Sequence, residues 1–223
     1  ILRIDSDTTK RKGAFKAMRG FIANSDVDII VGTQMLAKGH DFPNLALVVV
    51  LGTDQSLFSA DFRATERLYQ QLLQVSGRPG RGEKKGQVLL QTEFSQHPVY
   101  QSLIHQTFDE FAQNLLTERE DAAFPPYCYQ VLLKVAAKQE RNIWNFLSLA
   151  QKEAVEIKVS GIEVYDAVPS PLFKMSGFYR GQLLIQASSR KSMRGFLRVW
   201  STRIDGLKDN TVRYVLDVDP LDV

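Results

Sequence analysis

Three short runs, each with consecutive apolar residues at its centre, constrain the fold of the first half of the chain most strongly. They are VDIIVGT (27–33), LALVVVLG (45–52) and GQVLLQT (86–92), and β-branched residues recur in them. Continuous runs of this kind are typical of strands that are buried on both faces, as in parallel sheets. A fourth, shorter strand is predicted at Ile1–Ile4. The first half is therefore expected to be an open α/β structure.

Two helical segments separate these predicted strands. Apolar side chains recur at a helical period in residues 9–24 and again in residues 61–75. Alternating strands and helices predict a parallel sheet with helices on both of its faces. In such sheets ligands gather at the carboxyl ends of the strands. The polar segments 32–43 and 52–63 each follow a predicted strand, so both are expected at this edge.

The second half predicts a different arrangement, in the order β-α-β-β-α-β. The expected elements are residues 127–137, 140–158, 161–168, a hairpin over 171–187 with its turn at Ser176-Gly177, residues 189–205 and residues 212–218. This order is that of the split βαβ, or ferredoxin-like, fold. Many unrelated functions use that fold, so the order by itself carries no functional argument.

A connecting segment joins the two halves. Residues 97–121 carry apolar side chains at a helical period, and Pro98 suits a first helical turn, so one continuous helix is expected. The run Phe124–Pro126 ends the pattern. The expected organisation is a first domain over 1–96, a connecting helix over 97–123 and a second domain over 124–223.

Composition limits the classes of protein to which the chain can belong. No run of about 18 apolar residues is present, so no membrane-spanning helix is expected. The single cysteine, Cys128, excludes an internal disulfide and a multi-cysteine zinc site within these residues. Residues 1–123 carry 14 Lys and Arg against 15 Asp and Glu, and residues 124–223 carry 14 against 10. The second half is thus the better candidate for an anionic partner, although a solvated surface accounts for the excess equally well. The start ILRIDSD has no Met and is not a signal peptide, which indicates a piece of a longer protein.

The segment QVSGRPGR (74–81) is the strongest candidate for chemistry. Gln74, Arg78 and Arg81 are spaced i, i+4 and i+7, so on a helix they would lie along one stripe. Planar guanidinium groups beside glycines suit an anionic oxygen, although an arginine pair at a helix C-terminus is also favoured by the helix dipole. The sequence holds no phosphate loop of the form Gly-x-x-x-x-Gly-Lys-Ser/Thr and no Asp-Glu-x-His box. The phosphate cradle and the Mg²⁺ ligands of any nucleotide site would therefore lie elsewhere.

These residues resemble the motifs of a known group of enzymes. DIIVGTQMLAKGHDFPN (28–44) resembles motif V of superfamily 2 helicases, and QVSGRPGR resembles motif VI. The longer stretch GTQMLAKGHDFP, followed by DQSLFSADFRATERLYQQLLQVSGRPGR, is similar to the bacterial primosomal replication-restart helicases, the PriA family. The ending RYVLDVDPLDV (213–223) is also close to that family. The resemblance implies the later part of a second RecA-like lobe, followed by a C-terminal domain with an S10-like fold.

The resemblance also implies an activity, cofactors and partners. The family is a DNA-dependent ATPase that unwinds DNA 3′ to 5′ at stalled forks in the bacterial cytoplasm and reloads the primosome. ATP and Mg²⁺ would be shared with a first lobe, and the family's zinc would be held by a cysteine-rich insertion outside these residues. The implied partners are forked and single-stranded DNA, single-stranded DNA-binding protein and other primosome proteins.

In the family's motif VI, arginines reach across the cleft to the triphosphate. Carried over, Arg78 and Arg81 are the arginine-finger candidates, and Gln74 is a neighbouring polar contact. Pro79 stands where the family commonly has a small residue, and proline restrains Arg78 and weakens a helix there. Which arginine is the finger therefore stays open, with Arg81 slightly favoured. The positions expected on the nucleotide side are Gly39, Asp41 and Gly77, although Asp41 could instead cap a turn before Pro43.

Motif V supplies candidates for contacts to DNA. Thr33 and Gln34 leave the carboxyl end of a predicted strand, where short polar side chains suit phosphodiester contacts. Lys38 and His40 are candidates for DNA phosphates, and His40 is equally well explained as a loop histidine bonded to its neighbours.

The second half offers two further candidate surfaces. In the predicted hairpin, Lys174 and Arg180 lie near Phe178 and Tyr179, a mixture that suits single-stranded DNA but also an ordinary solvated hairpin. Arg190 and Arg194 belong to a basic helix face, which by resemblance contacts the acidic tail of single-stranded DNA-binding protein. A solvated helix face explains these arginines as well.

Between the two motifs, four charged residues are expected to form structural ion pairs or to couple the motifs: Asp54, Asp61, Arg63 and Glu66. Phe58 and Phe62 are expected in the core rather than against DNA bases. An alternative to the helicase is a non-catalytic adaptor, a degenerate RecA-like lobe that carries a domain for DNA or a partner. A phosphate loop and an acidic box upstream of Ile1 would favour the helicase.

Overall fold

The structure is a computed structural model of the 223-residue chain. It describes residues 1–5, 8, 20–22, 27–33, 45–59, 61–77, 86–207 and 210–221. The chain forms two compact units, Ile1–Leu115 and Leu116–Val223.

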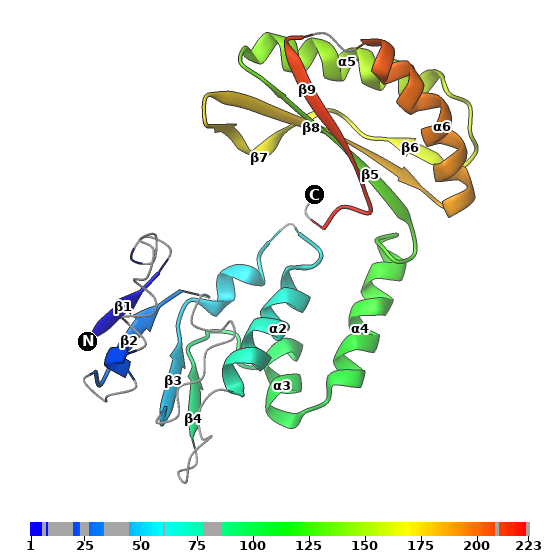
Figure 1. Ribbon diagram of the computed structural model, residues 1–223. Helices are drawn as coiled ribbons and strands as arrows, with labels where there is room; N and C mark the ends of the chain where they lie inside the picture. The colour runs from blue at the N-terminus through cyan, green and yellow to red at the C-terminus, as the bar shows by residue number, and fades with distance from the viewer. Residues whose placement is uncertain are drawn as a thin grey trace. The chain divides into compact units, whose positions relative to one another are not determined.

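The first unit contains two pairs of parallel strands (Figure 1). β1 (Leu2–Ile4) pairs with β2 (Ile30–Gly32), and β3 (Leu47–Val50) pairs with β4 (Gln87–Leu90). Parallel strands need a crossover connection rather than a tight hairpin, so the predicted α/β class is confirmed. The helix predicted over 9–24 lies outside the described residues, apart from the helical residues 20–22.

The prediction that these strands are buried on both faces is wrong. The register pairs Val49 with Leu89 and Val50 with Leu90, so the two pairs point to opposite faces of the sheet. Val50 and Leu90 pack against a hydrophobic cluster, whereas Val49 and Leu89 are 52% and 55% exposed. A β-branched composition sets the preference for a strand, but it does not set what covers each face.

Three helices build the core of the first unit. α2 (Ala64–Ser76) is the predicted helix, but the single helix expected over 97–121 is two, α3 (Pro98–His105) and α4 (Phe108–Asp121). Gln106 between them adopts a left-handed conformation with φ 58°, and its N–H donates to the carbonyl of Ser102. This is a helix C-terminal geometry, which the apolar period does not signal. The buried residues of the core are Leu68, Tyr69, Leu72, Val99, Tyr100 and Phe111.

The second unit is a five-stranded antiparallel sheet with two helices. Its elements are β5 (Tyr129–Ala137), α5 (Glu140–Glu156), β6 (Ile162–Val164), β7 (Val168–Met175), β8 (Phe178–Ala187), α6 (Arg190–Leu207) and β9 (Val212–Val218). The strand order is β6-β8-β5-β9, with β7 paired to β8 as a hairpin. The predicted ferredoxin-like arrangement is therefore confirmed. Ser176 and Gly177 form the hairpin turn with φ 52° and 81°, as a tight two-residue turn requires.

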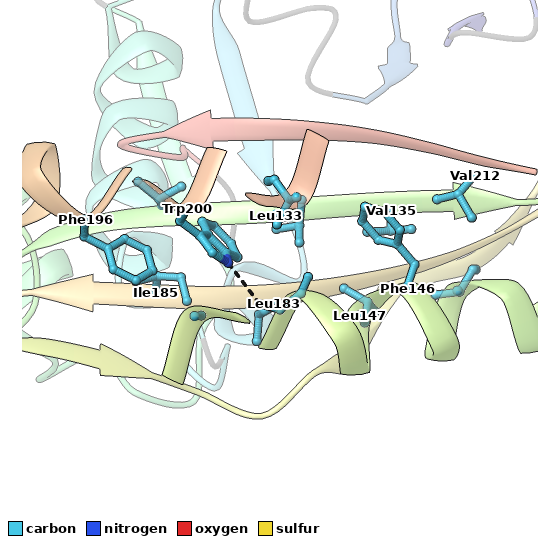
Figure 2. Packing of buried hydrophobic residues seen from close by; sticks show 14 of the residues in the cluster. Leu133, Val135, Phe146, Leu147, Leu183, Ile185, Phe196, Trp200 and Val212 are labelled. Atoms are coloured by element: carbon cyan, nitrogen blue, oxygen red, sulfur yellow. Dashed lines mark hydrogen bonds between the residues drawn. The ribbon is translucent and has the colours of Figure 1, made fainter. Parts of the chain in front are cut away.

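Helices α5 and α6 cover one face of this sheet and bury its core (Figure 2). Trp200 and Phe196 of α6 pack with Phe146 of α5 against strand residues such as Leu183. The Trp200 indole Nε1–H donates to the Ala150 carbonyl at 2.9 Å, which joins the two helices. The indole ring is fully buried, and its one polar atom has a hydrogen-bond partner.

Candidate functional site

The segment predicted to carry the arginine fingers begins in the last turn of α2. Gln74 is exposed on that turn, and α2 ends at Ser76, so the helical stripe expected from the i, i+4, i+7 spacing does not continue within α2. Gly77 follows, exposed, with its N–H donating to the Leu73 carbonyl at 3.3 Å. The predicted positions Arg78, Pro79 and Arg81 lie outside the described residues.

The motif V segment begins where β2 ends. Thr33 is exposed directly after this strand, at its carboxyl end, as a DNA-backbone contact in a parallel sheet requires. The other predicted positions of this segment lie outside the described residues: Gln34, Lys38, Gly39, His40 and Asp41.

The carboxyl ends of β3 and β4 are joined by a hydrogen-bond network around Asp54. Its Oδ1 accepts from the hydroxyls of Thr92 at 2.5 Å and Tyr100 at 2.8 Å, and its Oδ2 accepts from the Glu93 N–H at 2.8 Å. The hydroxyls of Tyr100 and Thr53 lie 2.8 Å apart, and Thr53 donates to the Gln91 carbonyl at 3.1 Å. Asp54 thus acts through hydrogen bonds, where an ion pair or coupling role was expected.

Two of the residues that supply hydroxyls to this network are buried. Tyr100 and Thr53 are only 1% and 5% exposed. The hydrogen bond from Thr92, together with that from the Glu93 N–H, lowers the pKa of Asp54, so the carboxylate is held ionised. Burial raises the pKa of Tyr100, which keeps its hydroxyl protonated as a donor. No periodic pattern in the sequence marks Thr92 or Tyr100 as members of this network.

The network is connected to α2 through packing. The Tyr100 ring belongs to the same buried cluster as Leu68 and Leu72 of α2. The short helix η2 (Thr53–Ser56), which carries Asp54, also contacts α2. The strand edge and the helix that leads to Gln74 therefore pack on the same buried cluster.

The charged residues between the two motifs form local contacts. Asp61 accepts a charge-assisted hydrogen bond from Arg67 Nη1 at 2.7 Å and caps the Arg63 N–H at 2.9 Å. The Arg63 guanidinium lies 4.2 Å over the ring of Phe62, and its buried Nη1 has no hydrogen-bond partner among the described residues. Glu66 accepts from Gln70 one turn later at 3.2 Å. The ion-pair expectation thus holds for Asp61, whereas Arg63 forms no ion pair within the described residues.

Phe58 is not a core residue, contrary to the expectation. Its side chain is 70% exposed, and its ring meets Phe94 edge-on at a centroid distance of 5.2 Å. The chain turns at Leu57–Phe58 after η2, which places the ring outside the cluster of α2 and α3. Phe62 is half-buried.

In the second unit, the structure separates the three predicted hairpin contacts. Lys174 and Tyr179 face each other across the hairpin, with the ammonium 4.6 Å from the ring centroid and 3.2 Å from the hydroxyl. The Tyr179 ring also meets Phe173 edge-on at 5.5 Å and packs on the core of the unit. Arg180, the next residue in β8, points to the opposite face of the sheet. The three side chains therefore do not form one surface.

The predicted partner-binding arginines are both exposed on α6. Arg190, at its first residue, places its guanidinium 5.4 Å over the ring of Tyr129. Arg194 follows one turn later, and Lys191 and Arg198 are exposed on the same helix. In the described part of the chain, neither Arg190 nor Arg194 is paired with a carboxylate.

Among the described residues, no cluster of three or more His, Cys, Asp or Glu side chains could hold a metal ion. None of the described helices is long and apolar enough to cross a membrane.

Comparison with known proteins decides the family. The model of the helicase conserved C-terminal domain matches residues 1–83, and that of the primosomal protein N C-terminal domain matches residues 120–221. The chain is 40% identical over 223 residues to replication restart protein PriA of Haemophilus influenzae. The chain belongs to the PriA family of replication restart proteins.

Other relatives agree with this assignment. The PriA proteins of Synechocystis and Bacillus subtilis are 36% and 34% identical over 100% and 89% of this chain. The chain spans 30%, 26% and 25% of the length of the Haemophilus, Synechocystis and Bacillus proteins, respectively. The helicase lobe and the PriA-type C-terminal domain thus occupy the two units that the structure separates.

Proposed function

We propose that the chain is part of an ATP-dependent 3′–5′ DNA helicase that restarts stalled replication forks in the bacterial cytoplasm and reloads the primosome. The single observation that carries the proposal is the joint match of a helicase C-terminal domain and a primosomal C-terminal domain. In this reading, the first unit supplies one wall of the ATP site. The phosphate cradle and the Mg²⁺ ligands belong to a first lobe outside these residues.

Arg78 and Arg81 would stabilise the negative charge that develops on the phosphoryl oxygens as the bond between the β- and γ-phosphates of ATP breaks. A guanidinium delivered from a second lobe can accelerate phosphoryl transfer by about 10³–10⁵. It acts only when the cleft closes, so it couples lobe movement to hydrolysis. Support for this role comes from α2, which ends just before Arg78, and from the buried network that holds α2 against the strand edge. Gln74 and Gly77, both exposed there, are proposed as polar neighbours of the nucleotide.

The remaining proposed contacts are to DNA and to a protein tail. Thr33, exposed at the end of β2, is proposed to contact the DNA backbone together with the rest of motif V. Arg190 and Arg194 are proposed to receive the acidic tail of single-stranded DNA-binding protein, since both guanidinium groups are exposed one turn apart.

Mutation of the two arginines in the full-length protein tests the proposal. The two single variants are Arg78→Ala and Arg81→Ala. In at least one of them, DNA-stimulated ATP turnover should fall by about 10³ or more, with DNA binding retained. Arg141→Ala, an exposed arginine of α5 that contacts Gln139, is the matched control and should keep normal turnover. Near-normal hydrolysis in both variants would reject the finger role, and a full-length protein that hydrolyses no ATP would favour the adaptor.

A further inference from the structure

The open face of the second unit's sheet carries a row of two arginines. The β5–β8 and β5–β9 registers pair Ala136 with Arg180 on one side and with Arg213 on the other. Directly paired residues point to the same face, and the neighbours Val135 and Ala137 are buried under the helices. Arg180, Ala136 and Arg213, here called the arginine row, therefore lie on the face that α5 and α6 leave open. The two outer strands are about 10 Å apart, with a small side chain between the two guanidinium groups.

The positive charge of the arginine row is not compensated locally. Arg213 is exposed and Arg180 is half-buried, and in the described residues neither forms an ion pair. Lys134, two residues from Ala136 on the same face, is instead neutralised by Asp217 at 2.6 Å. The row is thus the part of this face where an anion meets free guanidinium groups.

The acidic residues of this face lie further along the strands. Asp217 pairs with Leu132, four residues from Ala136, so the arginine row is about 13 Å away along the strand. Glu163 of β6 pairs with Gln186, beyond that level. The unpaired cations of this face therefore lie at the end near the β7–β8 turn, away from its carboxylates.

Apolar groups flank the arginine row at the end of the sheet face near the β7–β8 turn. The Arg213 guanidinium lies 5.3 Å over the ring of Phe178, which is on the same face as Arg180. Met175 pairs with Phe178 across the hairpin and is 41% exposed. A ring and a thioether beside two cations suit a ligand with both planar bases and charged phosphates.

We propose that the arginine row binds the backbone of single-stranded DNA, with Phe178 as a stacking contact. This inference rests on the proposed function, because it names the surface of the second unit that holds the DNA. Planar guanidinium groups match phosphate oxygens in charge and geometry. Within β5 and β8 the open face has no aromatic residue other than Phe178. Binding should therefore depend on backbone charge more than on base identity. An acidic peptide would use the same cations, but it has no need of the apolar flank.

The salt dependence of binding tests the proposal quantitatively. The probe is a labelled oligothymidylate, whose affinity for the 223-residue chain is measured by fluorescence anisotropy at several salt concentrations. Each single variant, Arg180→Ala or Arg213→Ala, should reduce the slope of log K against log salt by about 0.7, and the double variant by about 1.4. The charge-preserving change of both residues to Lys should keep the slope. Arg141→Ala, on the helix-covered side, is the matched control and should also keep it.

Each outcome decides the inference. If the double Ala variant keeps the wild-type slope while its far-UV circular dichroism is unchanged, the arginine row does not hold DNA, and the proposed helicase function stands. If the double variant loses binding to a glutamate-rich peptide but not to the oligothymidylate, the surface serves an acidic partner and the inference is overturned. If the slope falls as expected in the Ala variants and is restored in the double Lys variant, the result supports DNA binding by the arginine row. The proposed function fails independently, through ATP turnover in Arg78→Ala and Arg81→Ala.

Discussion

Removing one hydroxyl from the core of the first unit should weaken that unit alone. In Tyr100→Phe the ring stays in place, but the hydroxyl, which lies 2.8 Å from both Asp54 Oδ1 and Thr53 Oγ1 and has one proton to donate, is lost. The loss is therefore counted as one hydrogen bond to a charged group, which contributes about 1.5–3 kcal/mol. Asp54 keeps its bonds from Thr92 and Glu93, so it is not left unpaired. The expected loss is therefore about 1.5–3 kcal/mol, or a fall in Tm of roughly 6–12 °C for a unit of this size.

The distribution of tryptophan provides an internal control for this measurement. Both tryptophans, Trp144 and Trp200, lie in the second unit. Thermal unfolding followed by far-UV circular dichroism should show an earlier transition in Tyr100→Phe, whereas the transition followed by tryptophan fluorescence should not move. Tyr69→Phe, a buried tyrosine of the same cluster whose ring stacks on Phe111 at 4.7 Å, is the matched variant and should have a small effect.

Two results would refute the reasoning. A change of Tm below about 3 °C in Tyr100→Phe would show that the network does not stabilise the unit. An equal fall in the fluorescence transition would show that the hydroxyl stabilises the whole chain rather than the first unit.

Three further predictions concern single positions. Gly181→Ala should cost about 1–3 kcal/mol in urea unfolding followed by fluorescence, because a Cβ there would meet Ile143 Cγ2 and Leu147 Cδ1, each at 2.8 Å. Trp200→Phe should lower the calorimetric stability of the second unit by about 2–4 kcal/mol, since it removes the bond to the Ala150 carbonyl and leaves a cavity. Asp54 has a pKa lowered from 3.8, so its contribution is complete above about that pH and is lost as the pH falls through the folded value. Asp54→Asn should therefore flatten the acid limb of the stability profile of the first unit below about pH 4, and an unchanged limb would contradict the assignment.

Much of the fold could be predicted because it depends on local signals. The order β-α-β-β-α-β follows from changes of period along residues 127–218, and the hairpin turn follows from a Ser-Gly pair. The family could be predicted for the same reason, since motifs V and VI are continuous stretches. The break at Gln106 could not, because apolar side chains on α3 and α4 continue one helical period across a residue with positive φ.

The candidate sites were less predictable, because they are assembled from distant parts of the chain. Asp54 meets Thr92 and Tyr100 across 38 and 46 residues, and no spacing rule relates them. Arg213 joins Arg180 only through the register of β5 with its two neighbours.

The sequence alone determined which segments become strands and helices, because backbone propensity and side-chain period act over a few residues. Only the tertiary structure decided which face of each strand is covered and which side chains share it. That is why Val49 and Leu89 are exposed despite their β-branched and apolar surroundings, and why Lys174 and Arg180 point to opposite faces of one sheet. A strand presents two faces of nearly equal intrinsic preference, and the choice between them depends on what packs from elsewhere in the chain.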